Sequence, residues 1–101
     1  MVKKIIWSER AIKERTEILQ YWINRNKSKV YSLKLNALIK EEVTVLGKFP
    51  MIGKDTDVIN VKVKIIKDYL LYYEIKNNEL HILTIRDGRQ NPKLFKIREN
   101  S

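Results

Sequence analysis

The sequence predicts an α+β domain in which an N-terminal strand and a helical hairpin precede an antiparallel β-meander, with both helices packed on one face of the sheet. Two patterns predict this order. Apolar residues recur at helical spacing through the first half of the chain and alternate at strand spacing through the second. The chain has 101 residues, of which 44% are hydrophobic, so we expect residues 1–101 to form a single domain with one core.

The first strand and the first helix are predicted within residues 2–22. Residues 2–7 (VKKIIW) are rich in β-branched and aromatic side chains, which favours a short strand. Ser8 is suited to be the N-cap of the helix that follows, predicted over residues 9–22. The apolar stripe of this helix consists of Ala11, Ile12, Ile18, Leu19, Trp22 and Ile23, and the opposite side carries Glu14, Arg15 and Glu17.

A second helix is predicted after a polar interruption. The segment 24–29 (NRNKSK) breaks the helical pattern, and Ser28 is placed to cap a helix that runs to about Leu46. Gly47 is expected to terminate this helix, and Pro50 prevents it from restarting. We therefore expect two antiparallel helices joined by a short polar turn.

Three strands are predicted in the second half of the chain. Residues 58–66 (VINVKVKII) alternate at strand spacing and end at a turn, Lys67-Asp68. Residues 69–76 (YLLYYEIK) form the next strand, and Asn77-Asn78 suits a two-residue hairpin loop because asparagine tolerates a positive φ. Residues 80–86 (LHILTIR) form the last strand, which completes an antiparallel meander.

The alternation in the first of these strands places two lysines together. The side predicted to face the core carries Ile59, Val61, Val63 and Ile65. Lys62 and Lys64 are then expected to point to the opposite, open face of the sheet, roughly 7 Å apart. Such a pair can bind phosphate, although lysines on an open sheet face are also commonly solvated.

An aromatic ring and two arginines are expected near these lysines. Tyr72 or Tyr73, depending on the strand register, supplies a ring on the open face, and Arg86 and Arg89 stand at the end of the last strand. Cations that contact phosphates and a ring that stacks on a base form a plausible nucleic-acid platform. The alternative, a solvated basic face, is not excluded by the strand pattern alone.

The charge balance points to an anionic partner. Lysine and arginine total 21 against 12 aspartates and glutamates, which gives a formal net charge of +9 and an isoelectric point near 9.8. A small basic domain is attracted to nucleic acid, to the RNA-rich ribosome or to an acidic protein. A generic solubilising surface is the alternative interpretation.

Composition also excludes several classes of site. The chain has no cysteine, so disulfides and thiolate metal sites are excluded, and its one histidine, His81, has no neighbouring ligand set. No glycine-rich phosphate loop or dinucleotide motif is present, so no cofactor and no metal are expected. No signal peptide or membrane-spanning stretch is evident, which predicts a cytoplasmic protein without a membrane partner.

If the chain is an enzyme, metal-independent RNA cleavage fits these residue types, because it needs only positive charge and positioned side chains. The RNA 2′-hydroxyl attacks the adjacent phosphate, while lysine and arginine stabilise the charge of the transition state and a side chain shuttles protons.

The ordered set of local motifs resembles the RelE/ParE family of bacterial type II toxin–antitoxin modules. The resemblance extends from about Val2 to Phe95. Its features are Trp7-Ser8 followed by Ala11, Tyr21-Trp22, Leu46, Phe49-Pro50, Gly53, the hairpin Tyr69 to Tyr73, and the ending Ile85-Arg86-Asp87-Gly88-Arg89-Gln90-Asn91-Pro92. The resemblance implies a growth-inhibiting α+β toxin, of a kind linked to plasmid stabilisation. A cognate antitoxin would neutralise it with a flexible segment that is acidic where it covers the basic groove.

The family divides by target. RelE-like members enter the ribosome and cleave mRNA, whereas ParE-like members poison DNA gyrase and are not nucleases. Lys62, Lys64 and Arg89 match the RelE-like catalytic positions, so we interpret the chain first as an mRNA interferase that acts on ribosome-bound mRNA. Nucleic-acid binding is assigned to Arg86, Tyr72, Tyr73 and Lys93.

Two departures from the RelE-like pattern keep the alternatives open. Leu70 stands where an arginine is expected, and Phe95 stands near the usual C-terminal tyrosine. Loss of an arginine near the scissile phosphate would remove transition-state stabilisation. A ParE-like gyrase poison and a non-toxic basic binding module are therefore the alternative functions.

Overall fold

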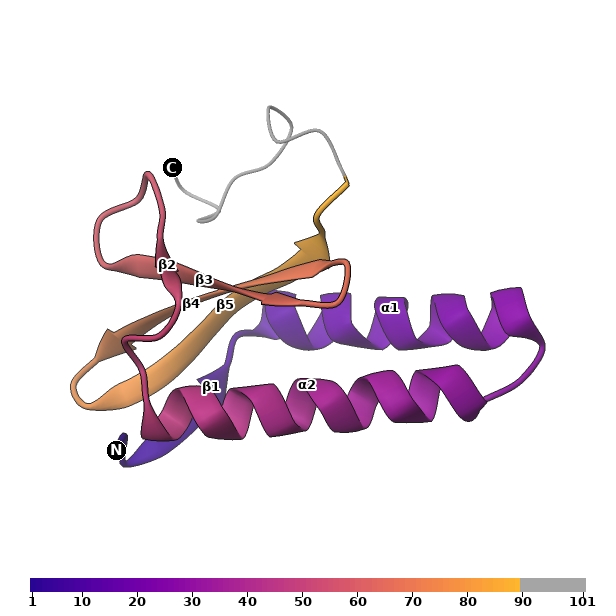
Figure 1. Ribbon diagram of the computed structural model, residues 1–101, viewed down its shortest axis with the longest axis horizontal. Helices are drawn as coiled ribbons and strands as arrows, with labels where there is room; N and C mark the ends of the chain where they lie inside the picture. The colour runs from indigo at the N-terminus through magenta and orange to yellow at the C-terminus, as the bar shows by residue number, and fades with distance from the viewer. Residues whose placement is uncertain (90–101) are drawn as a thin grey trace.

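The computed structural model describes residues 1–89, and it shows a five-stranded sheet with a helical hairpin beneath one face (Figure 1). The elements are β1 (Lys4–Trp7), α1 (Glu9–Asn26), α2 (Val30–Lys48), β2 (Lys54–Asp55), β3 (Val61–Ile66), β4 (Tyr69–Lys76) and β5 (Glu79–Asp87). The strand order is β1-β5-β4-β3-β2, in which only the β1–β5 pair is parallel. The predicted α+β fold is confirmed, and β2 adds a short edge strand that the alternation did not predict.

Ser8 joins the first strand to the first helix as predicted. Its side-chain oxygen accepts a hydrogen bond from the Ala11 amide at 3.0 Å, which caps α1. The same hydroxyl donates to the Leu83 carbonyl at 2.9 Å, and the Ser8 amide donates to the Ile82 carbonyl at 3.0 Å. These bonds hold the start of α1 against β5 at the point where β1 ends.

The turn between the helices differs from the prediction. α1 continues to Asn26 and ends at Lys27, which has a left-handed backbone with φ of 54°. The N-cap of α2 is Lys29, which has no side-chain capping bond, so the prediction of Ser28 as the cap is wrong. The Ser28 hydroxyl instead accepts a local bond from the Val30 amide at 3.2 Å.

Gly47 does not end the second helix. It lies within α2, which runs on to Lys48, and it is buried. A Cβ built on Gly47 would lie 3.4 Å from the Ile5 side chain and 3.6 Å from that of Val2. The Val2 amide also donates to the Gly47 carbonyl at 2.9 Å. These are ordinary van der Waals distances, so Gly47 lies where the N-terminal segment packs on α2, a long-range contact that local sequence does not show.

The face assignment of β3 is also wrong. Across the β3–β4 ladder Lys62 pairs with Tyr73 and Lys64 with Leu71, and both of these partners are fully buried. Because paired residues share a face, the two lysines lie on the side of the sheet that packs on the helices. Ile65, expected in the core, is 51% exposed.

The core lies between this face and the hairpin. Its buried members are Ala11, Leu35, Ile39, Val43, Leu46, Ile66, Tyr69, Leu71, Tyr73, Leu80, Ile82 and Ile85. They come from both helices and from β3, β4 and β5. This continuous layer fixes the sheet on the hairpin and sets the positions of the charged residues described below.

Candidate functional site

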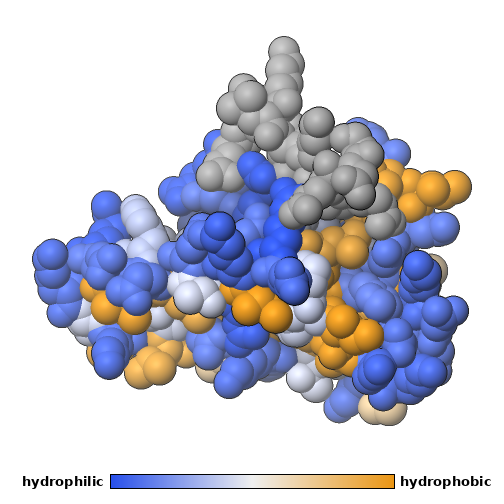
Figure 2. All heavy atoms as spheres, turned by 180° about the vertical axis from the view of Figure 1, so that it is seen from behind, coloured by the Kyte–Doolittle hydropathy of each residue, from blue (hydrophilic) through white to orange (hydrophobic). Residues whose placement is uncertain are grey.

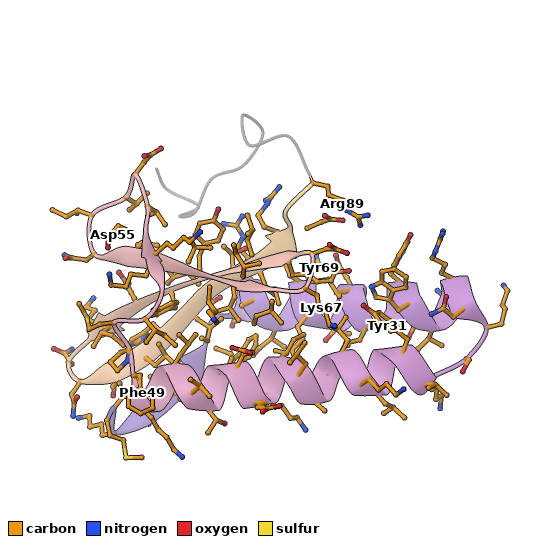
Figure 3. All side chains as sticks on the ribbon, in the orientation of Figure 1. Tyr31, Phe49, Asp55, Lys67, Tyr69 and Arg89 are labelled. Carbon is orange, nitrogen blue, oxygen red and sulfur yellow. The ribbon has the colours of Figure 1, made fainter. Side chains whose placement is uncertain are left out.

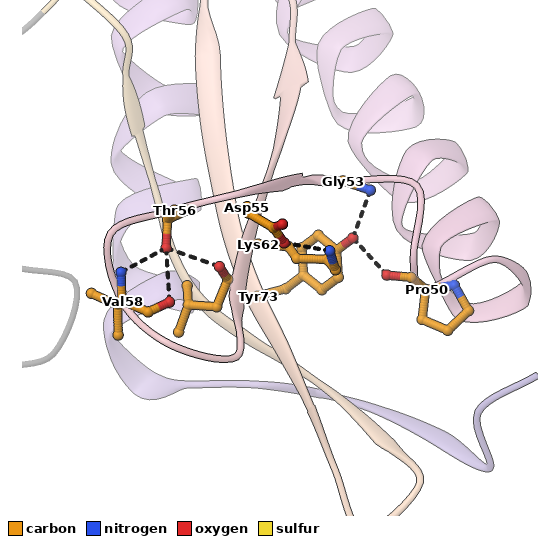
Figure 4. A network of polar contacts seen from close by, with 8 residues as sticks. Pro50, Gly53, Asp55, Thr56, Val58, Lys62 and Tyr73 are labelled. Atoms are coloured by element: carbon orange, nitrogen blue, oxygen red, sulfur yellow. Dashed lines mark hydrogen bonds and ion pairs between the residues drawn. The ribbon is translucent and has the colours of Figure 1, made fainter.

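Both candidate lysines are held by carboxylates. Lys62 Nζ lies 2.6 Å from Asp55 Oδ1 on the neighbouring edge strand, and the lysine side chain is only 19% exposed (Figure 4). Lys64 Nζ lies 3.8 Å from Glu42 Oε2 on α2. Lys62 and Lys64 thus pair with the edge strand β2 and with α2, and they do not lie on the open face of the sheet.

Tyr73 is a structural anchor in the core. Its ring is fully buried, and burial raises the pKa of its hydroxyl. The hydroxyl donates to the Pro50 carbonyl at 2.7 Å and accepts from the Gly53 amide at 3.0 Å (Figure 4). The structure therefore corrects the assignment of Tyr73 to nucleic-acid binding, because no face of this ring is accessible for stacking.

Tyr72 occupies the other face of the same strand. It pairs with Val63 on β3 and with Thr84 on β5, and it is partly buried. Burial raises the pKa of its hydroxyl, while nearby Arg86 opposes that rise. Of the two tyrosines left open by the sequence, Tyr72 is the one on the face of the sheet opposite to the helices.

Arg86 lies on the same face as Tyr72, and therefore opposite to the lysines. It pairs across the ladder with Leu70, the position where the family pattern has an arginine. Burial lowers the pKa of Arg86, and the charge of Glu14 counteracts this effect.

Arg89 is fixed by its own neighbour. Its Nε and Nη2 atoms donate to the two carboxylate oxygens of Asp87 at 2.9 and 2.8 Å, and its amide donates to Oδ1 at 2.9 Å. These bonds hold the pKa of Asp87 below its ordinary value. The turn is further held by the Gly88 amide, which donates to the Asp68 carbonyl at 2.8 Å.

The two arginines share a pocket with acidic and aromatic side chains. The pocket has a volume of about 380 Å³ and is lined by Glu14, Glu17, Ile18, Tyr21, Tyr69, Ile85, Arg86, Asp87 and Arg89. Neither candidate lysine contributes to it. Asp55, the partner of Lys62, lies at the other end of the sheet from Arg89 (Figure 3). The structure thus brings the arginines together and separates them from the lysines.

Glu14 is a site residue that the sequence did not reveal. It was assigned to the solvent side of α1, yet its Oε1 accepts bonds from the Thr84 hydroxyl at 2.5 Å and the Ile85 amide at 3.2 Å. Its Oε2 lies 3.5 Å from Arg10 Nε. Glu14 therefore satisfies the edge of β5 beyond the end of β1. Arg15, assigned to the same side, donates to Asn36 and lies 4.8 Å above the Trp7 ring.

The remaining positions singled out in the sequence add few contacts to the site. Lys93 and Phe95 lie outside the described residues. His81 Nε2 lies 3.2 Å from Glu79 Oε1. Among residues 1–89 no three histidine, aspartate or glutamate side chains are grouped so that they could hold a metal ion. None of the helices in this part of the chain combines the length and apolar character needed to cross a bilayer.

Comparison with known proteins assigns this arrangement to a family. The model of the ParE toxin of type II toxin–antitoxin system, parDE, matches residues 5–92. A search of curated proteins found no match. Among solved structures, the chain is similar to a chain of the "Chromosomal ParDE TA system from P. aeruginosa", with a TM-score of 0.73 and 19% sequence identity. The match covers 83% of this chain and 94% of the other, which supports the same fold.

Proposed function

Because the chain belongs to the ParE toxin family of type II toxin–antitoxin systems, we propose that it arrests growth by poisoning DNA gyrase. It is a toxin component, and its partner is a cognate antitoxin. We place its action in the cytoplasm, where gyrase works. An acidic antitoxin segment would suit a toxin of net charge +9.

The observation that carries the proposal is the separation of the four candidate cations. Lys62 and Lys64 lie on the covered face, whereas Arg86 lies on the opposite one. Lys62 stands four residues before the end of β3, roughly 13 Å along the strand from the turn beside Asp87. RNA cleavage needs cations and a proton-transfer group within hydrogen-bond reach of one phosphate. Within residues 1–89 no such convergence of these side chains occurs.

A gyrase poison has no need of a catalytic group. It has to bind the enzyme while DNA is cleaved, and a basic surface assists association with a protein–DNA complex. The pairing of Lys62 and Arg89 with carboxylates is compatible with this function, since neither side chain has to contact a reacting phosphate.

The direct test uses purified toxin, gyrase and supercoiled plasmid. We expect linear DNA to accumulate when the reaction is stopped with detergent, supercoiling activity to fall, and excess antitoxin to reverse both effects. A parallel reaction contains ribosomes and a defined mRNA. Undisturbed gyrase together with cleaved mRNA would overturn the proposal.

mRNA cleavage on the ribosome stays the second candidate. The observation in its favour is that Arg86 and Arg89 line one pocket with Tyr69, which puts two cations near a phenol. That mechanism assigns the phosphate to Lys62, Lys64 and Arg89 and the RNA to Arg86, Tyr72 and Lys93. It therefore requires cations that this structure holds apart to meet at one phosphate. A non-toxic binding module would be identified by normal growth when the chain is expressed without antitoxin.

A further inference from the structure

The longest stretch of the sequence without an acidic residue lies in the helical hairpin. Residues 18–40 contain no aspartate or glutamate and supply five of the nine excess positive charges. These cations are Arg25, Lys27, Lys29, Lys34 and Lys40. All five side chains are exposed. The first four surround the turn between α1 and α2, and we call residues 24–34 the basic hairpin tip.

The basic hairpin tip is not neutralised by the rest of the described chain. Several cations elsewhere have acidic neighbours: Lys4 lies near Glu79, and Lys62, Lys64 and Arg89 each have a carboxylate. By contrast, no carboxylate of residues 1–89 pairs with any cation of the tip. The tip also projects beyond the sheet, so its charge faces solvent on several sides (Figure 1).

Two of these lysines occupy positions that local energetics disfavour. Lys27 has a φ of 54°, a left-handed conformation at a helix C-terminus that glycine adopts with less strain. Lys29 is the N-cap of α2, where the helix dipole favours an anion and where its side chain forms no capping bond. Lysine at both positions costs stability and adds charge to the same turn.

The side chains between the cations are suited to phosphate contacts. Asn24, Asn26 and Ser28 alternate with Arg25, Lys27 and Lys29, so every residue of this segment carries either a positive charge or a neutral hydrogen-bonding group. Proteins contact the DNA backbone with this combination of side chains. From behind, the far end of the hairpin is covered mostly by hydrophilic side chains (Figure 2).

We propose that the basic hairpin tip binds the phosphate backbone of double-stranded DNA. A projecting tip can reach the phosphates that border a major groove about 12 Å wide, whereas the major groove of A-form RNA is too narrow for side chains to enter. The binding is not specific for sequence, because phosphate contacts carry no direct sequence information. The proposal does not rest on gyrase as the target, since DNA alone is the ligand.

The test measures binding of the toxin to a fluorescent DNA duplex of mixed sequence by anisotropy, as a function of salt. If four phosphates are neutralised, the slope of log K against log salt is about −3.6, and affinity falls about 150-fold between about 50 and 200 mM salt. The tip variant Lys27→Gly/Lys29→Gln/Lys34→Gln should reduce the slope to about −0.9 and the loss to about 3.5-fold.

The matched control removes three lysines from the other end of the molecule. Lys3, Lys48 and Lys76 are exposed, and they lie near the N-terminus, the end of α2 and the end of β4 (Figure 1). Their change to glutamine removes the same charge but should leave most of the slope intact. Equal losses in both triple variants would overturn the proposal, because attraction would then be a property of net charge alone.

Lys27→Gly separates binding from folding. Glycine suits the left-handed position, so thermal stability should be equal or higher while the salt slope becomes shallower by about 0.9. An unchanged slope in both Lys27→Gly and the tip variant would contradict the proposal. So would tighter binding to the matching RNA duplex. Val30 and Leu33 lie within the tip and are 60% and 65% exposed. Because an acidic protein segment can contact such apolar side chains as well as the cations, binding of polyglutamate is measured as a further comparison. If the tip variant lost polyglutamate binding but bound DNA unchanged, the tip would be assigned to an acidic protein partner and not to DNA.

Discussion

The contact between Gly53 and Tyr73 gives a quantitative prediction about the loop after α2. A Cβ built on Gly53 would lie 2.8 Å from Cε1 and 2.9 Å from Cζ of the fully buried Tyr73 ring. Overpacking of this kind costs about 1–3 kcal/mol. Displacement of the Gly53 amide from the hydroxyl adds about 1 kcal/mol. We therefore expect Gly53→Ala to lower the free energy of unfolding by about 2–4 kcal/mol.

A double-mutant cycle identifies the atom responsible. Tyr73→Phe leaves the Gly53 amide and the Pro50 carbonyl without their partner, at a cost of about 1–3 kcal/mol. In that background Gly53→Ala should cost less, because the hydroxyl nearest to the new methyl group is absent and the ring is no longer tethered at its tip. We expect the two single costs to exceed the cost of the double variant by at least about 1 kcal/mol.

The assay is urea unfolding followed by tryptophan fluorescence, with thermal melts as a second measurement. Gly53→Ala should lower the melting temperature by about 10–20 °C in a chain of this size. Tyr21→Phe serves as the control, since its ring is 51% exposed, and it should stay within about 0.5 kcal/mol of wild type. If the costs at Gly53 and Tyr73 add within about 0.5 kcal/mol, the reasoning is refuted.

Three further predictions follow from other contacts. Glu14→Ala should lower the free energy of unfolding by about 2–3 kcal/mol, because the buried Thr84 hydroxyl and the Ile85 amide lose their acceptor. The control Glu17→Ala removes an exposed carboxylate and should stay within about 0.5 kcal/mol of wild type, as measured by urea unfolding. Arg89 lowers the pKa of Asp87, so the contribution of this carboxylate to folding stability is present above about pH 4 and is lost as the pH falls through the lower folded pKa. The stability difference between wild type and Asp87→Asn should therefore be constant near neutral pH and shrink in acid. Urea unfolding at several pH values measures this difference. Lys62→Ala and Lys64→Ala should leave growth arrest unchanged in cells if the toxin poisons gyrase, whereas lost toxicity in folded variants would favour mRNA cleavage.

Local sequence signals predicted the parts of the fold that depend on local interactions. The helical periodicity located both helices, and the Ser8 hydroxyl caps α1 as expected. Asn77 and Asn78 both adopt positive φ, 55° and 60°, as their side chains allow. Each of these features is determined by residues within one turn of the chain.

Long-range packing determines the features that were missed. Gly47 resembles a helix terminator in the sequence, but the N-terminal segment that packs against it lies more than forty positions away along the chain. Glu14 resembles a solvent-facing residue. However, β1 pairs with β5 only as far as Ile82, and beyond it α1 lies beside β5, where the Ile85 amide donates to Glu14. Neither contact can be predicted before the packing of the N-terminal segment and the order of the strands are known.

The lysine face shows why a functional site on a strand is hard to predict from alternation. In β3 the exposed Ile65 and the buried Ile66 are adjacent, so each face of the strand carries an apolar residue. The neighbouring strand β4 (YLLYYEIK) is apolar on both faces as well, and thus does not select one. A shift of one residue in register exchanges the two faces completely. The pairing of Lys62 with buried Tyr73 therefore moves the lysines from an open phosphate platform to the covered side, which is the physical reason to look for the toxin's target beyond RNA cleavage.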